Sequence, residues 1–309
     1  MSKLRPFALR DKLGNIVSGS LVYSITKPKN GDFFLVVEGV KRNEINPGNY
    51  SSIVRQYYGS ATASENFGDK AKAFISSYGY APSNVLLSDS ICSDDVDGPI
   101  YADVTNIGQT PSSLNEFLGA FMSGGLAGYP HTGTLGIAAW ASHATTTTKG
   151  ALFLINMPHI GISIDNQVGR IKRRGKATNG ADNTCGAVAT AIAWVMANAV
   201  APVATNFPND YQNYVLCNIL FPFKAAITAL PTYGARMIYA TEKIRVAGDT
   251  FLIGASGISA NVPAGIDVFY CSGTFINTDD TYSAYINVTS FKKFNGTWSD
   301  LTTAFLNTL

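Results

Sequence analysis

The chain has 309 residues, of which 46% are hydrophobic and only 14% are charged, and its formal net charge is +2 at neutral pH. This balance predicts a folded protein with a sizeable buried core and excludes an intrinsically disordered chain. A nearly neutral charge argues against a dedicated nucleic-acid-binding protein. Four cysteines are too few for a disulfide-dense secreted scaffold of this length, and they suit a reducing compartment.

The first part of the chain predicts a β-hairpin. Residues 16–39 hold two alternating, β-branched runs on either side of Lys29-Asn30-Gly31-Asp32. An Asn-Gly pair between two such runs is typical of a hairpin turn. We therefore assign residues 1–55 to an N-terminal extension and residues 56–309 to one compact domain.

The rest of the chain alternates between strand and helix patterns without a long linker, which predicts an α/β fold. Helical spacing of apolar residues runs over 66–78, and a short strand leads from Val85 toward Cys92. The run ALFLINM at 151–157 is typical of a fully buried strand. Further elements are expected as helices at 112–122, 185–198 (capped by Asn183 or Thr184) and 219–230, and as strands at 267–276 and 285–291.

Residues 185–204 are uncharged and, at about 20 residues, long enough to cross a bilayer. Their apolar character comes mainly from alanine, and Gly186, Asn198 and Pro202 interrupt them. Such a segment inserts weakly. We therefore expect a buried core helix here and no association with a membrane.

Two cysteines and one histidine stand at the ends of predicted elements. Cys92 follows a strand, His159 follows the strand ALFLINM after Pro158, and Cys185 begins a helix, whose dipole favours a thiolate. The ends of strands in an open α/β sheet meet at one edge, where sites form. Two thiolates and one imidazole with an open fourth position are the ligands of a catalytic zinc ion. Buried structural thiols and a histidine bonded to backbone are the alternative, since the three residues are far apart in the sequence.

Two other regions are unusual. No charged residue occurs between Glu116 and Lys149, a glycine-rich segment in which His143 is either a proton shuttle or a core residue. The glycines match no phosphate-binding loop, and we expect them to permit close backbone approach beside a pocket. Residues 170–176, RIKRRGK, are either a solvated hairpin or a cluster that attracts anions toward the site.

Four stretches, in order, resemble the limiting-carbon-dioxide-inducible protein B/C family, which is similar in fold to β-class carbonic anhydrases and is often called the θ class. They are CSDD at 92–95, GGLAGYPHTGTLGIAAWASHA at 124–144, PHIGI with QVGRIKRRGK and TCGA between 158 and 187, and INTDD at 276–280. The resemblance implies a β-carbonic-anhydrase-like sheet flanked by helices. It also implies zinc bound by Cys92, His159 and Cys185, reversible hydration of carbon dioxide to bicarbonate, and a homodimer.

The resemblance also implies a role for Asp94, which matches the aspartate of a Cys-x-Asp motif. In β-class enzymes an arginine holds this aspartate away from the metal. Here no arginine occurs between Arg55 and Arg170. Arg170, Arg173 or Arg174 would have to fold back over the site; otherwise Asp94 itself could ligate zinc and close the fourth position.

Four functions follow as hypotheses. The first is an active zinc-dependent carbonic anhydrase, in the cytoplasm or, if a transit peptide has been removed, in the plastid stroma. The second is a zinc-bound but inactive scaffold or sensor that acts through protein partners, which the missing local arginine favours. The third is a metal-free thiol protein, and the fourth is a zinc hydrolase with another substrate.

Overall fold

The computed structural model describes residues 47–64, 67–92, 118–122, 129, 138, 141–142, 150–172, 181–279 and 284–309, together with 22–26 and 34–38. For 22–26, 34–38, 47–49, 89 and 118–122 it describes the backbone alone. The two strands near the N-terminus, β1 (Val22–Thr26) and β2 (Phe34–Glu38), pair antiparallel, with Val22 opposite Glu38. The two strands of the predicted hairpin therefore pair as expected, and the Asn30-Gly31 turn between them lies outside the described residues.

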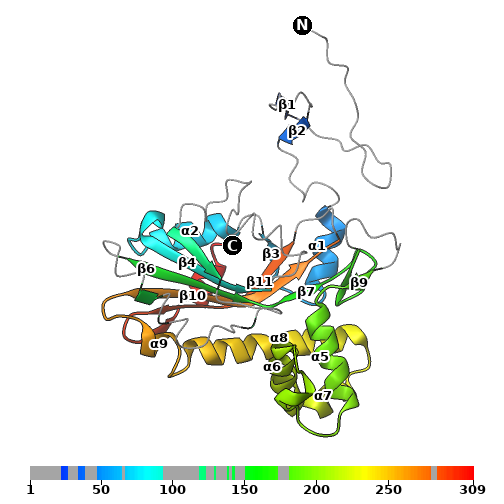
Figure 1. Ribbon diagram of the computed structural model, residues 1–309. Helices are drawn as coiled ribbons and strands as arrows, with labels where there is room; N and C mark the ends of the chain where they lie inside the picture. The colour runs from blue at the N-terminus through cyan, green and yellow to red at the C-terminus, as the bar shows by residue number, and fades with distance from the viewer. Residues whose placement is uncertain are drawn as a thin grey trace, which may run out of the picture.

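A mixed eight-stranded sheet forms the centre of the domain (Figure 1). Its main path runs in the order β12-β11-β10-β6-β4-β5, and β3 and β7 pair with β11 and β10 at one end. Strands β5, β4, β6, β10 and β7 pair in parallel with one another. Strand β11 pairs antiparallel with β10, β12 and β3. The bounds are β3 (Thr62–Ala63), β4 (Val85–Ile91), β5 (Leu118–Met122), β6 (Ala151–Met157), β7 (His159–Gly161), β10 (Asp267–Asn277), β11 (Tyr285–Phe294) and β12 (Trp298–Asp300).

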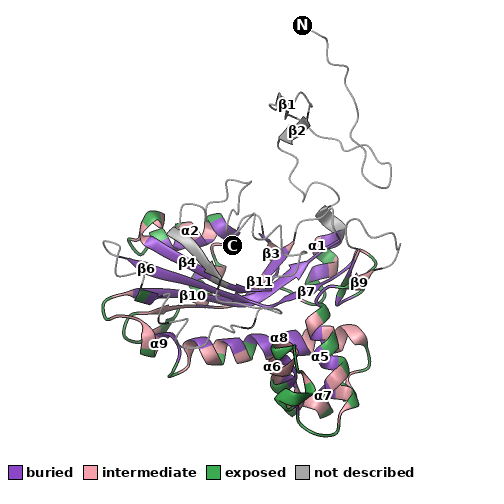
Figure 2. Ribbon diagram, in the orientation of Figure 1, coloured by how far each residue is buried: buried purple, intermediate pink, exposed green. Residues whose placement is uncertain are grey.

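Two helices cover one face of the sheet. These are α2 (Phe67–Ser76) and the short α10 (Thr302–Leu306). Phe67 and Phe74 of α2 pack with Phe305 of α10 and Phe291 of β11 in a buried aromatic cluster. Alternate residues of β6, among them Phe153, reach this face, and every residue of the strand is buried (Figure 2).

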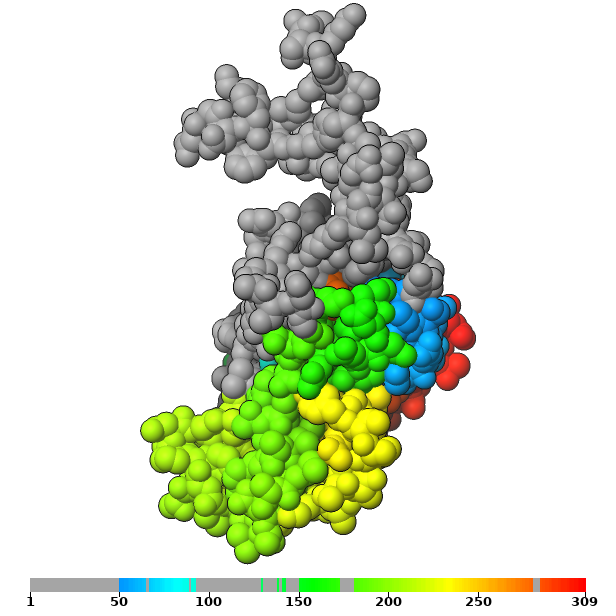
Figure 3. Space-filling model, turned by 90° about the vertical axis from the view of Figure 1, so that its right-hand side faces the viewer, coloured from blue at the N-terminus to red at the C-terminus, as the bar shows by residue number. Residues whose placement is uncertain are grey.

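The longest helix, α8 (Tyr233–Ile253), crosses the other face, and α9 (Ile258–Asn261) follows it (Figure 1). Beside its first half lie α5 (Gly186–Ala197), α6 (Tyr211–Leu220) and α7 (Lys224–Ala229). These three helices project from the sheet as a lobe (Figures 1 and 3). Among the described helices, none combines the length and the apolar character that a bilayer crossing requires.

A buried polar cluster joins α8 to the middle of the sheet. The Asp249 carboxylate accepts hydrogen bonds from Asn156 Nδ2 and Ser272 Oγ, both at 2.7 Å, and from the Tyr270 hydroxyl. Arg245 forms an ion pair with Asp249 and donates to Ser272 Oγ at 2.9 Å. We call these five residues the Asp249 cluster. Since its charges pair with one another, its role is to fix α8 against β6 and β10.

The helix α1 (Pro47–Arg55) is also fixed to the core. Tyr50 is 1% exposed, and its hydroxyl donates to the carbonyl of Ile162 at 2.7 Å and accepts from the N–H of Asp279 at 2.9 Å. The Asp279 carboxylate in turn accepts from the N–H groups of Ile164 (3.0 Å) and Lys172 (2.6 Å). Tyr50 and Asp279 together hold the hairpin that follows β7.

Two predicted helices are wrong in part. Residues 118–122, at the end of the helix expected over 112–122, form β5, which pairs parallel with β4. The ladder to β4 is a long-range interaction, and helical spacing in a short apolar run cannot reveal it. The helix expected over 219–230 is divided, because Pro222 lies in a 3-10 turn, Phe221–Phe223, between α6 and α7.

Candidate metal centre

Three buried ligand side chains converge at the end of the parallel strands. Cys92 directly follows β4, His159 is the first residue of β7, and Cys185 precedes the first residue of α5. Their exposed fractions are 1%, 0% and 1%. The two Sγ atoms and the imidazole nitrogen all lie within 4.8 Å of one another. The prediction that strand ends bring these three residues together is thus confirmed; we call them the Cys-His-Cys cluster.

Tight packing of glycine explains how the His159 strand and the Cys185 loop come so close. A Cβ atom on Gly161 would lie 1.8 Å from Thr184 Oγ1 and 2.7 Å from Ile171 Cγ2. The Gly161 carbonyl accepts from the N–H of Gly169 at 2.7 Å, and the Gly169 carbonyl accepts from the N–H of Thr184 at 3.0 Å. Because only glycine fits at 161, this residue sets the distance between the two ligand segments.

The structure corrects the predicted cap of α5. Cys185, rather than Asn183 or Thr184, is the N-cap residue, and its side chain makes no capping hydrogen bond. Asn183 belongs instead to the short strand β9 (Asp182–Asn183), which pairs with β8 (Arg170–Ile171). The Cys185 side chain is therefore turned to the cluster and not to its own helix.

In the metal-free protein, Cys185 retains its proton. Its hydrogen bond with Cys92, and then burial, raise the pKa of its thiol well above the usual range, and these effects outweigh the lowering by His159. The N-terminus of a helix by itself favours a thiolate, as we expected from the sequence. Here the hydrogen bond with Cys92 and burial favour the protonated thiol instead. A bound dication would restore the thiolate, because a coordinated thiol is deprotonated.

The His159 ring is held by a neighbouring strand. Its Nδ1 atom lies 2.7 Å from Oδ1 of Asn277, the last residue of β10. Because an amide oxygen only accepts hydrogen bonds, this contact favours the tautomer in which Nδ1 carries the proton and donates. The lone pair of the neutral ring is then on Nε2, which is the form of histidine that binds a metal.

The donor set fits a zinc ion. Zinc binds thiolate sulfur at about 2.3 Å and imidazole nitrogen at about 2.0–2.1 Å in tetrahedral geometry, which places the ligand atoms about 3.5–3.8 Å apart. The three ligand atoms lie within 4.8 Å of one another, which is compatible with this geometry. Burial and the ordered histidine are also what a metal site requires.

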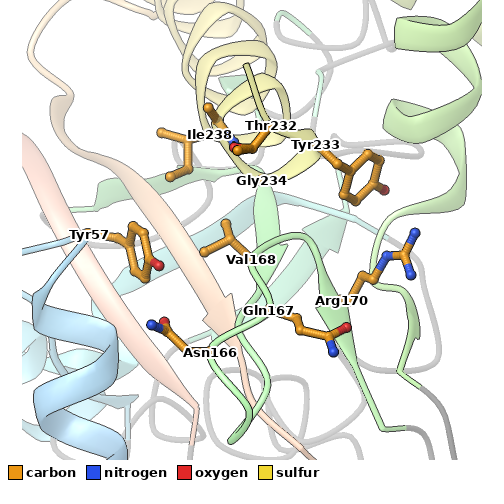
Figure 4. A pocket seen from close by; sticks show the side chains of 10 residues that line it. Tyr57, Asn166, Gln167, Val168, Arg170, Thr232, Tyr233, Gly234 and Ile238 are labelled. Atoms are coloured by element: carbon orange, nitrogen blue, oxygen red, sulfur yellow. The ribbon is translucent and has the colours of Figure 1, made fainter. Parts of the chain in front are cut away.

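Arg170 lies beside a pocket that does not include the Cys-His-Cys cluster. The pocket has a volume of about 560 Å³ and is lined chiefly by residues 166–168 and the first turns of α8 (Figure 4). The exposed Arg170 guanidinium lies 5.1 Å from the centre of the Tyr233 ring. Asp94 and His143 lie outside the described residues, so the pairing of Arg170 with Asp94 and the shuttle role of His143 stay predictions.

The family of the chain follows from a comparison with family models. The model described as limiting CO2-inducible proteins B/C β-carbonic anhydrases matches residues 61–295. The chain belongs to this family. A search of curated proteins returned no match.

Solved structures agree on the fold. The crystal structure of PtLCIB4, a homologue of the limiting CO2-inducible protein LCIB, matches with a TM-score of 0.67 and 23% identity, over 81% of this chain and 98% of that one. The crystal structure of LCIB itself matches with a TM-score of 0.53 and 16% identity, over 79% and 95% of the two chains. The β-carbonic-anhydrase-like α/β sheet flanked by helices is therefore confirmed.

Sequence reasoning did not assign a role to two residues of the site. Asn277 lies in the INTDD stretch and Gly161 in the PHIGI stretch, so both were noticed as part of a motif. Neither carries a charge or a metal-ligating atom. Their importance depends on which side chains face them, and that depends on the pairing of β7 with β10.

Proposed function

We propose that the protein binds one zinc ion through Cys92, His159 and Cys185 and catalyses the reversible hydration of carbon dioxide to bicarbonate. The observation that carries the proposal is the convergence of these three buried ligands, within 4.8 Å of one another, in a member of this family. Family membership is the reason for proposing this reaction. The Cys-His-Cys cluster is a site at which a zinc ion suited to that reaction could bind.

The residues around the site account for its chemistry. Cys92, His159 and Cys185 would hold the zinc ion, and three protein ligands would leave its fourth position open for a water molecule. The two thiolates would balance the charge of the dication, and the neutral imidazole would add none. Zinc bound in this way lowers the pKa of its water to about 7 and provides a nucleophile at neutral pH. In the proposal Asp94 hydrogen-bonds near the open position, a basic residue such as Arg170 holds it away from the metal, and His143 relays the proton.

The test is stopped-flow hydration of carbon dioxide on metal-quantified protein. Wild type is expected to contain about one zinc per chain, as its single Cys-His-Cys shell requires, and to hydrate carbon dioxide in proportion to that content. Cys185→Ala is expected to lose both zinc and activity. Cys217→Ala is the matched control, because Cys217 is equally buried in the helical lobe but lies outside the cluster. Absence of zinc from wild type would contradict the proposal and favour a metal-free thiol protein.

An inactive zinc-bound scaffold or sensor is the second candidate. Two observations favour it: no arginine occurs between Arg55 and Arg170, and the Arg170 side chain lies over the ring of Tyr233. Bound zinc without hydration above buffer at neutral or alkaline pH would support this candidate. X-ray absorption would then show Asp94 as a fourth ligand, and Asp94→Asn would reopen that position.

The family resemblance also supplies a proposal for assembly. We infer a homodimer, in the cytoplasm or the plastid stroma, with carbon dioxide and bicarbonate as its small-molecule partners and with no nucleic-acid or membrane partner. Light scattering on the purified chain would measure the dimer directly. A monomer at micromolar concentration would contradict it.

A further inference from the structure

We propose that Asn277 is a positioning residue for the metal site: it holds the neutral His159 ring in the tautomer that leaves Nε2 as the ligand atom. This inference rests on the proposed function in one respect only, that Nε2 is directed at a metal. Asn277 carries no charge and would act on the metal only through its contact with His159. The function proposed above assigns it no role.

The position of Asn277 is fixed by its backbone. It ends β10, where it lies opposite Gly161 of β7 in parallel register, and its carbonyl accepts a hydrogen bond from the N–H of Ile162 at 3.0 Å. It is 3% exposed, and His159 is 0% exposed. Its side chain therefore leaves a paired strand end toward His159, and the distance of 2.7 Å between Oδ1 and Nδ1 is that of a well-formed hydrogen bond.

The hydrogen bond selects one tautomer because the acceptor is an amide oxygen. Neutral imidazole has one N–H and one lone pair, so a proton on Nδ1 leaves the lone pair on Nε2. In the opposite tautomer, the Nδ1 lone pair would face the Oδ1 lone pairs inside a buried site. Leaving such buried groups without a hydrogen bond costs about 1–3 kcal/mol, which is enough to make the Nδ1–H tautomer dominant.

An amide differs from the carboxylates that often orient metal-bound histidines. With two thiolates, a neutral histidine and a neutral Asn277, the charge of a bound dication is just cancelled. The nearby carboxylate, Asp279, is directed elsewhere, because its oxygens accept from the backbone N–H groups of Ile164 and Lys172. The chain thus uses its acid to hold the hairpin and a neutral acceptor to orient the histidine.

The experiment uses the metal-free full-length protein, with two-bond 15N–1H NMR to identify the tautomer of His159. The chain has three histidines, so His159→Gln assigns the signal. Wild type at mildly alkaline pH is expected to show the proton on Nδ1. An Nε2–H tautomer in wild type would overturn the inference, whether or not the protein binds zinc or hydrates carbon dioxide.

Variants then measure the consequence for the metal. Asn277→Ala is expected to lose the preference for the Nδ1–H form and to bind zinc about 10–100-fold more weakly in a chelator competition. Asn277→Asp keeps an acceptor at the same place, so it is expected to restore the tautomer and to bind zinc at least as tightly as wild type. Asn287→Ala and Asn287→Asp are the matched controls, since Asn287 lies on the adjacent β11 and only accepts from Ser60 Oγ at the surface.

Each outcome separates the two proposals. Unchanged tautomer and zinc affinity in a folded Asn277→Ala would overturn the positioning role. If Asn277→Ala does not fold, loss of the Nδ1–H form in Asn277→Asp would do the same. A wild type with the Nδ1–H tautomer that binds no zinc would instead overturn the proposed function, and would leave the hydrogen bond as assigned.

Discussion

The Asp249 cluster and the Cys-His-Cys cluster are both largely buried beside the central sheet. The first joins β6 and β10 to α8, and the second lies at the ends of β4 and β7 and at the start of α5. They differ in how their charges are satisfied. In the Asp249 cluster a carboxylate faces a guanidinium, two hydroxyls and an amide, so that donors and acceptors match within the protein. In the Cys-His-Cys cluster two thiols and an imidazole face one another, and their shared preference is for a cation.

The way in which the charges are satisfied separates a structural polar cluster from a functional one. The Asp249 cluster pairs its charges within the protein, so it requires no bound ion, and it stabilises the packing of α8 against the sheet. A cluster of soft donors gains most of its stability only when a metal arrives. The two should therefore respond in opposite ways to substitution and to zinc.

The largest expected effect is on the Asp249 cluster. Arg245→Ala would leave the Asp249 carboxylate, which is only 17% exposed, without its cation. We expect it to lower the free energy of unfolding by about 3 kcal/mol, the lower end of the range for a fully buried pair. Glu242→Ala is the control: Glu242 also pairs with Arg245, but its side chain is 46% exposed, so the expected loss is below about 1 kcal/mol. Urea unfolding measures both. Equal losses in the free energy of unfolding would show that the ion pair between Arg245 and Asp249 stabilises the fold no more than the exposed pair between Arg245 and Glu242.

The next largest expected effect is the stabilisation of the fold by zinc, which should bind at the Cys-His-Cys cluster and not at the Asp249 cluster. At a free zinc concentration about 100 times the dissociation constant, wild type should gain about 2.7 kcal/mol in the free energy of unfolding. Cys185→Ala should gain little, whereas Arg245→Ala, if it folds, should gain as much as wild type. A similar gain in Cys185→Ala would mean that zinc stabilises the protein at some other place.

Much of the fold could be predicted because local patterns agreed with the tertiary structure. The Asn-Gly hairpin, the helix around Phe67 and Phe74, and the strand ALFLINM each have a periodicity or turn that identifies them. The helix α8 was not predicted. It carries Arg245 and Asp249 toward the sheet and buries Met237 and Leu252, so polar and apolar residues alternate on its buried side and the usual apolar stripe is obscured.

The ligands of the candidate site could be predicted from the sequence, but the residues that position those ligands could not. Cys92, His159 and Cys185 could be predicted as ligands because the chain has few cysteines and histidines and because these three stand at the ends of predicted strands and helices. Asn277 and Gly161 could not be assigned, since an amide and a glycine occur throughout the chain. Only the register of β7 against β10 and the contact with Thr184 give them a function.

A smaller effect tests the close contact between the two ligand segments. Gly161→Ala would place a methyl group against Thr184 Oγ1, which should destabilise the fold by about 1–3 kcal/mol and weaken zinc binding further by moving Cys185 away from His159. Gly186→Ala is a matched control, because Gly186 is next to Cys185 and an added Cβ would meet nothing within 4 Å. It should be neutral or slightly stabilising. Urea unfolding and chelator competition measure the two variants, and intact zinc affinity in Gly161→Ala would show that the contact does not set the site.

The smallest expected effect is the pH dependence of the metal-free protein. Because the hydrogen bond with Cys92 and burial raise the pKa of Cys185, the folded state holds this proton more tightly than the unfolded chain, whose thiol titrates near about 8.5. The associated stability is complete below that pH and is lost as the pH rises through the folded pKa.

In a chelator, wild type should therefore lose stability between pH 8 and pH 10 more steeply than Cys185→Ala, by at most about 1.4 kcal/mol per pH unit. Other buried groups, such as Cys271 and Tyr270, titrate in both proteins and cancel in the difference. Equal slopes would mean that folding leaves the pKa of Cys185 unchanged. A shallower loss in wild type than in Cys185→Ala would mean that Cys185 is already a thiolate before metal binds. The N-terminus of α5 would then outweigh burial and Cys92, and the Cys-His-Cys cluster would be prepared for a cation in advance, as the Asp249 cluster is for its arginine.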